Sequence, residues 1–128
     1  MDLNQISSNI IKAAINIHNE LGPGLLESVY QSCMTVELKQ MGMKVEAEKP
    51  CPVVYRGQKI NEQGFRIDLL VEDGVVVELK SVEKVRNIHK KQLLTYLRLA
   101  NKSLGLLVNF NENLLKNGIT RVVNNLKE

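Results

Sequence analysis

The sequence has few cysteines and lacks the features of a secreted or membrane-spanning chain. Cys33 and Cys51 lack the close spacing of a metal site, so we expect free thiols in or near the core, as in a cytosolic protein. No apolar run is long enough to cross a bilayer. The first residues, Met-Asp-Leu-Asn, lack the basic-then-apolar order of a signal peptide. These absences predict a cytoplasmic protein with no membrane partner.

Charge of one sign is not in large excess either. The chain has 17 basic and 14 acidic residues and a net charge of +3, which by itself is too mild to indicate nucleic-acid binding. No serine or cysteine is paired with a histidine in a recognisable motif, so nucleophilic catalysis has little support. We find no internal repeat. The 128 residues are enough for one domain with a real core, so we predict a single domain over residues 1–128.

The most informative segment present is Arg66 to Lys80, which reads R-I-D-L-L-V-E-D-G-V-V-V-E-L-K. Two apolar runs flank the loop Glu72-Asp73-Gly74, and we expect Gly74 to take the left-handed conformation that ends such loops. A three-residue loop predicts a hairpin register with three facing pairs: Val71 with Val75, Leu70 with Val76, and Asp68 with Glu78. Because side chains alternate along a strand, Asp68, Glu78 and Lys80 would then share one face.

A two-residue loop at Asp73-Gly74 is the competing register. It would place Asp68 opposite Leu79, on the other face from Glu78, and would leave a carboxylate on each face of a very apolar hairpin. We therefore favour the three-residue loop.

Facing carboxylates repel each other unless a cation lies between them. Mg²⁺ typically binds one or two protein carboxylates together with waters and substrate phosphates. Asp68 and Glu78 with Lys80 beside them would suit the hydrolysis of a phosphate ester. The hairpin alone leaves a second interpretation open, in which these residues form a solvated polar face and Lys80 pairs with Glu78 or Asp68.

The N-terminal part of the chain predicts two helices. Apolar residues at helical spacing run from Ile6 to Leu21, and Gly22-Pro23 would end that helix. A second helix should run from about Leu25 to Met41, and its apolar residues cover more than one stripe, which predicts that it is well buried. Glu27 and Tyr30 share a face of its first turn, where a glutamate also has an ordinary role in complementing the helix dipole.

The middle and C-terminal parts predict strands around a third helix. Residues 44–60 resemble strands, with an edge or kink at Pro50 and Pro52 and a turn at Arg56-Gly57, and residues 59–63 form a loop or edge strand. Asn87 is the expected N-cap of a helix that ends near Ala100. Residues 104–110 are apolar and predict a buried strand parallel to a hairpin strand, and residues 118–123 a last strand.

The third predicted helix carries a polar stripe and a group of basic residues. His89, Gln92 and Tyr96 recur on one face. Lys90 and Lys91 belong to a basic stretch that is either a solvated helix face or a surface that contacts phosphates beside the site.

Taken together, these segments resemble the PD-(D/E)xK nuclease superfamily and, within it, the small GxxExxY proteins. The resemblance extends from about Ile6 to Val123. It rests on five segments in order: Gly24 to Tyr30 (G-L-L-E-S-V-Y), Phe65 to Val71 (F-R-I-D-L-L-V), Val77 to Lys80 (V-E-L-K), His89 to Leu97 (H-K-K-Q-L-L-T-Y-L) and Gly105 to Phe110 (G-L-L-V-N-F). Ile67 stands where the family name has proline, which is a common variation.

The resemblance implies an α+β (α/β) fold with a restriction-endonuclease-like core: a central mixed β-sheet, including an antiparallel hairpin, flanked by helices. It implies that Asp68 and Glu78 bind Mg²⁺ or Mn²⁺ and that Glu27 is a third ligand or water anchor. Lys80 would position or deprotonate the attacking water. Gln92 would support the site or touch substrate. We expect Tyr30, His89 and Tyr96 to pack around the site.

Two functions remain open at this point. The first is a metal-dependent nuclease that hydrolyses phosphodiester bonds in DNA or RNA. The second is a non-catalytic module that keeps the fold and binds nucleic acid or a protein. The intact Asp68, Glu78 and Lys80 favour the first. The small size and modest charge leave room for a homo-oligomer or a partner subunit.

Overall fold

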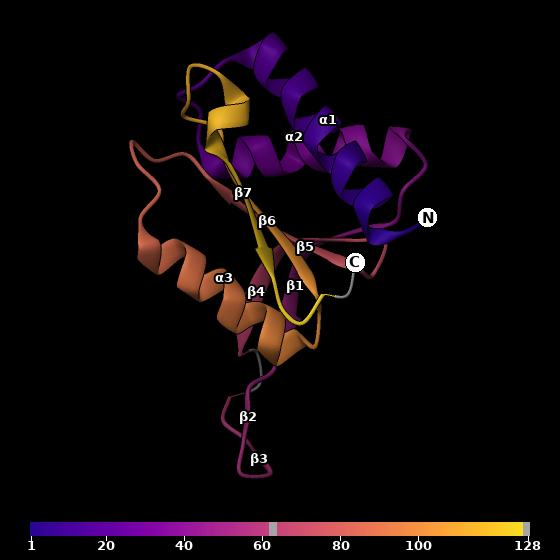
Figure 1. Ribbon diagram of the computed structural model, residues 1–128, viewed down its shortest axis with the longest axis vertical. Coiled ribbons are helices and arrows are strands. Elements are labelled where there is room, and N and C mark those ends of the chain that lie inside the picture. The colour runs from indigo at the N-terminus through magenta and orange to yellow at the C-terminus, as the bar shows by residue number, and fades with distance from the viewer. Residues whose placement is uncertain (62–63, 127–128) are drawn as a thin grey trace.

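The computed structural model describes residues 1–61 and 64–126, and Figure 1 shows how its elements are arranged. The helices are α1 (Leu3–Leu21), α2 (Glu27–Gln40) and α3 (Asn87–Ala100), with a short 3₁₀ helix η1 (Leu115–Gly118). The strands are β1 (Val45–Cys51), β2 (Val54–Tyr55), β3 (Gln58–Lys59), β4 (Phe65–Val71), β5 (Val75–Lys80), β6 (Leu104–Asn109) and β7 (Ile119–Val123). No helix in these residues is both long and apolar enough to cross a bilayer.

The main sheet has five strands in the order β1-β4-β5-β6-β7. β5 and β6 are parallel, as expected for strands joined through a helix, and the other neighbours are antiparallel. β1 is at an edge of this sheet, as Pro50 predicted. The predicted mixed sheet flanked by helices is therefore confirmed. The predicted turn at Arg56-Gly57 is also confirmed, because it joins β2 to β3 in a separate two-stranded hairpin.

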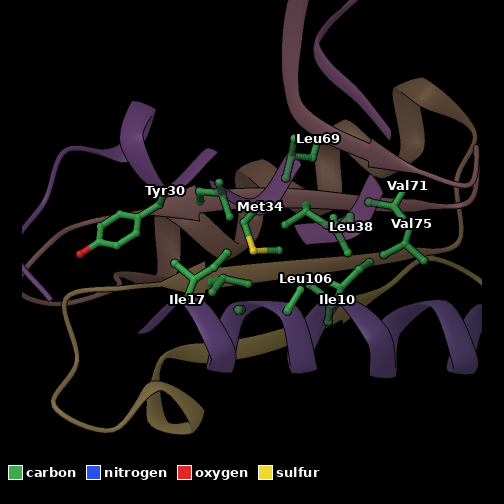
Figure 2. Close-up of a cluster of buried hydrophobic side chains, with 14 of the residues drawn as sticks. Ile10, Ile17, Tyr30, Met34, Leu38, Leu69, Val71, Val75 and Leu106 are labelled. Carbon is green, nitrogen blue, oxygen red and sulfur yellow. The ribbon is translucent and has the colours of Figure 1, made fainter. Parts of the chain in front are cut away.

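Two apolar layers hold the sheet between the helices. α1 and α2 cover one face, where Met34 and Leu38 of α2 lie among side chains of the sheet (Figure 2) and Tyr30 belongs to the same buried cluster. α3 covers the other face through Leu93 and Leu97. Burial of apolar area stabilises such layers by about 25 cal/mol per Å².

The burial of α2 differs from the prediction. This helix was predicted to be well buried, but Leu26, Val29 and Val36 are exposed, because the sheet and α1 cover only the stripe that includes Tyr30. The apolar residues of the sequence therefore overstated how much of α2 is covered.

The tight β4–β5 turn has the predicted three-residue loop, because Val71 pairs with Val75 and Leu70 with Val76. The conformation expected at Gly74 is wrong. Glu72 and Asp73 take positive φ values, both 52°, and Gly74 does not. Residue 74 lies close to α1 instead: a Cβ atom there would lie 2.9 Å from Leu3 Cδ2, so the Leu3 side chain would have to shift to accommodate it.

The ends of the helices agree with the sequence in part. α1 ends before Gly22, whose φ is 73°, as predicted. Asn87 is the first residue of α3 rather than its N-cap, which is Arg86. The backbone N–H of Arg86 donates to His89 Nδ1 at 3.0 Å, so a histidine side chain replaces the expected asparagine cap. In the predicted segment 59–63, Lys59 belongs to β3, while residues 62 and 63 lie outside the described residues.

Candidate active site

The β4–β5 ladder ends just before Asp68, and its last paired residues are Leu69 and Val77. Beyond that pair, Asp68 Oδ2 accepts a hydrogen bond from the backbone N–H of Leu79 at 2.8 Å. The carboxylate thus takes the place of a backbone acceptor, and its position is fixed by the neighbouring strand.

The side-chain alternation of β4 also changes at Asp68. Leu69 and Val71 pack toward α1 and α2, whereas Ile67 and Leu70 both pack toward α3. In β1, the neighbouring Glu48 has a φ of 53°, which costs a non-glycine residue on the order of 1 kcal/mol. Irregular backbone of this kind often lies at functional sites.

Glu78 is buried beside Asp68, with 8% of the residue exposed. Its Oε1 atom has no hydrogen-bond partner among the described residues. Burial, a side-chain hydrogen bond to Asp68 and the Asp68 charge together raise the pKa of Glu78 from 4.5 to about 9. Glu78 therefore keeps its proton at neutral pH when no cation is bound.

Lys80 is half-buried two residues further along β5. Its charge acts to lower the pKa of Glu78, against the larger effects of burial and Asp68. Within the part of the chain that the structure describes, Lys80 makes no ion pair within 4.0 Å. The interpretation in which Lys80 simply pairs with Glu78 or Asp68 therefore has no support from the geometry.

Glu27 lies near this end of β5 but is held by other contacts. Its Oε1 accepts from the backbone N–H of Ser81 at 3.3 Å, and Ser81 Oγ donates to the carbonyl oxygen of Leu25 at 2.7 Å. No three His, Cys, Asp or Glu side chains in the described residues are grouped so that they could hold a metal ion. The structure thus brings Asp68 and Glu78 together without Glu27, whose role as a third ligand stays a prediction.

Tyr30 anchors the loop that leads to Glu27. The hydroxyl of this buried residue donates to Gly22 O at 2.6 Å and accepts from Leu25 N–H at 3.2 Å. Its ring stacks on Phe110, with centroids 4.2 Å apart. The spacing from Gly24 through Glu27 to Tyr30 therefore has a structural explanation: Tyr30 fixes the loop, and the loop and Glu27 fix Ser81, which follows Lys80.

Tyr96 and His89 both lie on α3 and make different contacts. Tyr96 stacks on Phe65 with centroids 4.2 Å apart. Burial raises the pKa of Tyr96, and so do the nearby charges of Glu78 and Asp68, which places its hydroxyl close to the pair. His89 caps α3 and lines an open hollow of about 650 Å³ with Val82 and Arg86.

The remaining predicted contacts lie on the surface of α3. Gln92, Lys90 and Lys91 are exposed. None of their side chains has a hydrogen bond or ion pair to another described residue. Their roles toward substrate stay predictions.

Asn109 is a site residue to which we assigned no role from sequence. It is fully buried at the end of β6, opposite Lys80 in the parallel ladder. Its side chain accepts from Val82 N–H at 3.1 Å and donates to Val82 O at 2.9 Å. It therefore fixes the chain directly after Lys80. The sequence signal that could have identified Asn109 is its position as a single amide near the end of the apolar run 104–110.

The donor set of the pair fits a hard divalent cation. Asp68 and Glu78 supply carboxylate oxygens, and Mg²⁺ is commonly bound by one or two carboxylates with waters and phosphates filling the other positions. The unpaired, buried Glu78 Oε1 is an acceptor without a donor, which a cation would satisfy.

Comparisons with known proteins agree with this geometry. A family model described as the PD-(D/E)XK nuclease superfamily matches residues 4–122, which include every element of the main sheet except the last residue of β7. No curated protein and no solved structure matched significantly.

Proposed function

Because the chain belongs to the PD-(D/E)XK nuclease superfamily, we propose that it is a metal-dependent nuclease that hydrolyses phosphodiester bonds in DNA or RNA. The observation that carries this proposal is the carboxyl pair itself: Glu78 is buried against Asp68 with one oxygen unpaired. A fold that needed only a polar surface would gain nothing from burying a carboxyl group in this way.

In this proposal Asp68 and Glu78 hold Mg²⁺ or Mn²⁺. The ion, when bound, supplies positive charge at the phosphate under attack. Leu79 N–H keeps the Asp68 carboxylate in place, and Glu78 would have to release its proton to solvent in order to ligate the ion as a carboxylate. Lys80 orients the attacking water and donates to a phosphate oxygen as charge develops there.

Glu27, Gln92 and the lysines of α3 have supporting roles in the same proposal. Glu27 fixes Ser81 and thereby the backbone next to Lys80. Gln92, Lys90 and Lys91, which are exposed, contact the substrate strand. We also propose that, within the PD-(D/E)XK nuclease superfamily that the family model describes, the chain is one of the GxxExxY proteins.

A cleavage assay tests the proposal. Purified protein is incubated with Mn²⁺ and a mixture of single- and double-stranded DNA and RNA. We expect cleavage that a chelator and Asp68→Ala both abolish. Asp73→Ala is the matched control, because Asp73 is an exposed acid at the turn of the same hairpin. Cleavage that survives Asp68→Ala would contradict the assignment of the site to this carboxyl pair, and binding without any cleavage would instead support the non-catalytic module.

A further inference from the structure

Four of the five aromatic residues are used in two stacked pairs within the fold. The chain has three tyrosines and two phenylalanines. Tyr30 stacks on Phe110, and Phe65 stacks on Tyr96. The fifth aromatic residue, Tyr55, has no such partner and is 59% exposed.

Tyr55 lies in a hairpin that projects from the body of the protein, away from α1 and α2 (Figure 1). We call residues 53–60 the arm. Two ladder pairs join its strands, Val54 with Lys59 and Tyr55 with Gln58, and both strands are exposed. Below them the backbone N–H of Ile60 donates to Val53 O at 2.9 Å. Val54 and Ile60 are 60% and 57% exposed. Exposed apolar side chains on a projecting ribbon indicate a binding surface rather than part of a core.

The charge of the arm is of one sign. Arg56 and Lys59 are its ionisable cations, and residues 53–60 contain no acid. The Arg56 guanidinium carbon lies 5.3 Å from the centroid of the Tyr55 ring. An exposed ring combined with cations offers a face for a nucleobase and charge for its phosphates, which is how sequence-tolerant single-strand binders are built.

The arm is attached next to the candidate active site. Its base lies at Cys51 and Phe65, which pair with each other, and Phe65 stacks on Tyr96 beside the carboxyl pair. The shortest path along the chain runs from Asp68 to Phe65, crosses to the paired Cys51 and continues to Tyr55. If every residue on this path is fully extended, Tyr55 lies within about 30 Å of Asp68. Stacked nucleotides rise by about 3.4 Å each, so one strand of about nine nucleotides would span that distance.

We propose that the arm is a stacking platform for unpaired bases and that the nuclease acts on single-stranded or locally unpaired nucleic acid. This inference rests on the proposed function and adds the substrate class. Base pairs within a duplex bury both faces of each base, whereas an unpaired base offers a free face to Tyr55.

The chain has no tryptophan, which allows a direct test. Tyr55→Trp places a single fluorophore on the arm, and Val36→Trp places one at an exposed residue of α2 as the matched control. Each variant is titrated, in chelator to prevent cleavage, with oligothymidylate, oligouridylate and a blunt DNA duplex of about 12 nucleotides. Fluorescence anisotropy of labelled strands reports binding independently.

We expect an unpaired oligonucleotide to quench Tyr55→Trp over the concentrations at which anisotropy reports binding, and to leave Val36→Trp unchanged. The two oligonucleotides also distinguish DNA from RNA. Tyr55→Ala should weaken binding about tenfold, and Tyr55→Phe should keep it, because the ring rather than the hydroxyl makes the contact.

Binding without quenching, equal quenching by the duplex, or no binding at all would overturn the stacking role. The proposed function is judged separately by Asp68-dependent cleavage. Cleavage without quenching would reject the arm alone, whereas quenching without cleavage would reject the nuclease and keep the arm.

Discussion

Asp68 and Glu78 place two carboxyl groups where the β4–β5 ladder has ended, and the two groups differ in their hydrogen-bond partners. Asp68 accepts from Leu79 N–H, but Glu78 Oε1 has no partner among the described residues. Burial and the neighbouring Asp68 disfavour the charged form of Glu78 and raise its pKa to about 9. In the metal-free protein Glu78 therefore keeps its proton at neutral pH.

This raised pKa predicts how the stability of the metal-free protein depends on pH. Below about pH 4.5 Glu78 is protonated in both the folded and the unfolded chain, so its contribution is fully present. As pH rises toward about 9, the unfolded chain loses that proton more readily, and the free energy of unfolding should fall by up to about 1.4 kcal/mol per pH unit.

Urea denaturation in chelator measures this slope. Glu78→Gln has no titrating group at residue 78 and serves as the reference. The difference in the free energy of unfolding between wild type and variant therefore isolates the contribution of Glu78. A difference that stays constant from about pH 5 to about pH 9 would contradict the buried, protonated Glu78.

At Lys80 we predict a separation of cleavage from metal binding. Lys80→Ala should lower the cleavage rate by about 10² or more, because the ammonium acts on water and phosphate. Mn²⁺ affinity should change little, since an ammonium cannot ligate the ion. Calorimetry with Mn²⁺ checks the second part, and a variant that no longer binds Mn²⁺ would refute the assigned role.

At the scale of elements, the loop between α1 and α2 depends on one hydroxyl. Tyr30→Phe keeps the ring on Phe110 but leaves Gly22 O and Leu25 N–H without that partner. We expect a loss of about 1–3 kcal/mol in the free energy of unfolding, measured by urea denaturation. Tyr55→Phe, which removes an exposed hydroxyl, is the control. Equal stability of the two variants would show that the Tyr30 hydroxyl does not anchor the loop.

The exposed face of α3 gives a second prediction at this scale. If Lys90 and Lys91 contact phosphates, changing both to Gln should lower affinity evenly across sequences. The slope of log K against log salt should become less steep by about two. Lys39→Gln with Lys116→Gln removes the same charge from exposed residues of other elements. A slope that changes equally in both double variants would show a general charge effect.

At the scale of the whole molecule, hydrophobic periodicity predicted the helices and the strands because burial of one face leaves a clear signal in sequence. The strand–helix–strand connection predicted the parallel pair, and the resemblance to the nuclease superfamily implied the mixed sheet. Loop length and strand alternation predicted that Asp68 and Glu78 come together. The sequence did not predict that the side-chain alternation of β4 changes at Asp68. That change depends on the Asp68 carboxylate, which accepts the hydrogen bond from Leu79 N–H in place of a backbone carbonyl.

Contacts between distant segments were also beyond the sequence. The bond from Ser81 to Glu27 and those from Asn109 to Val82 join residues that no local pattern relates. The exposure of Val29 and Val36 was missed for a similar reason, since an apolar residue does not say whether another element covers it.

If Asp68 and Glu78 together bind a divalent cation, calorimetry should detect both the binding and the proton that it displaces. Titration of Mn²⁺ at pH 7 in buffers of different ionisation enthalpy measures both affinity and proton release. Glu78 is protonated at that pH when its pKa is about 9, so we expect release of about one proton per ion. Glu78→Gln should abolish the release, and Asp68→Asn should abolish most of the affinity. Mn²⁺ binding that persists in both variants, or no binding by the wild type, would show that the two carboxyl groups do not hold the ion.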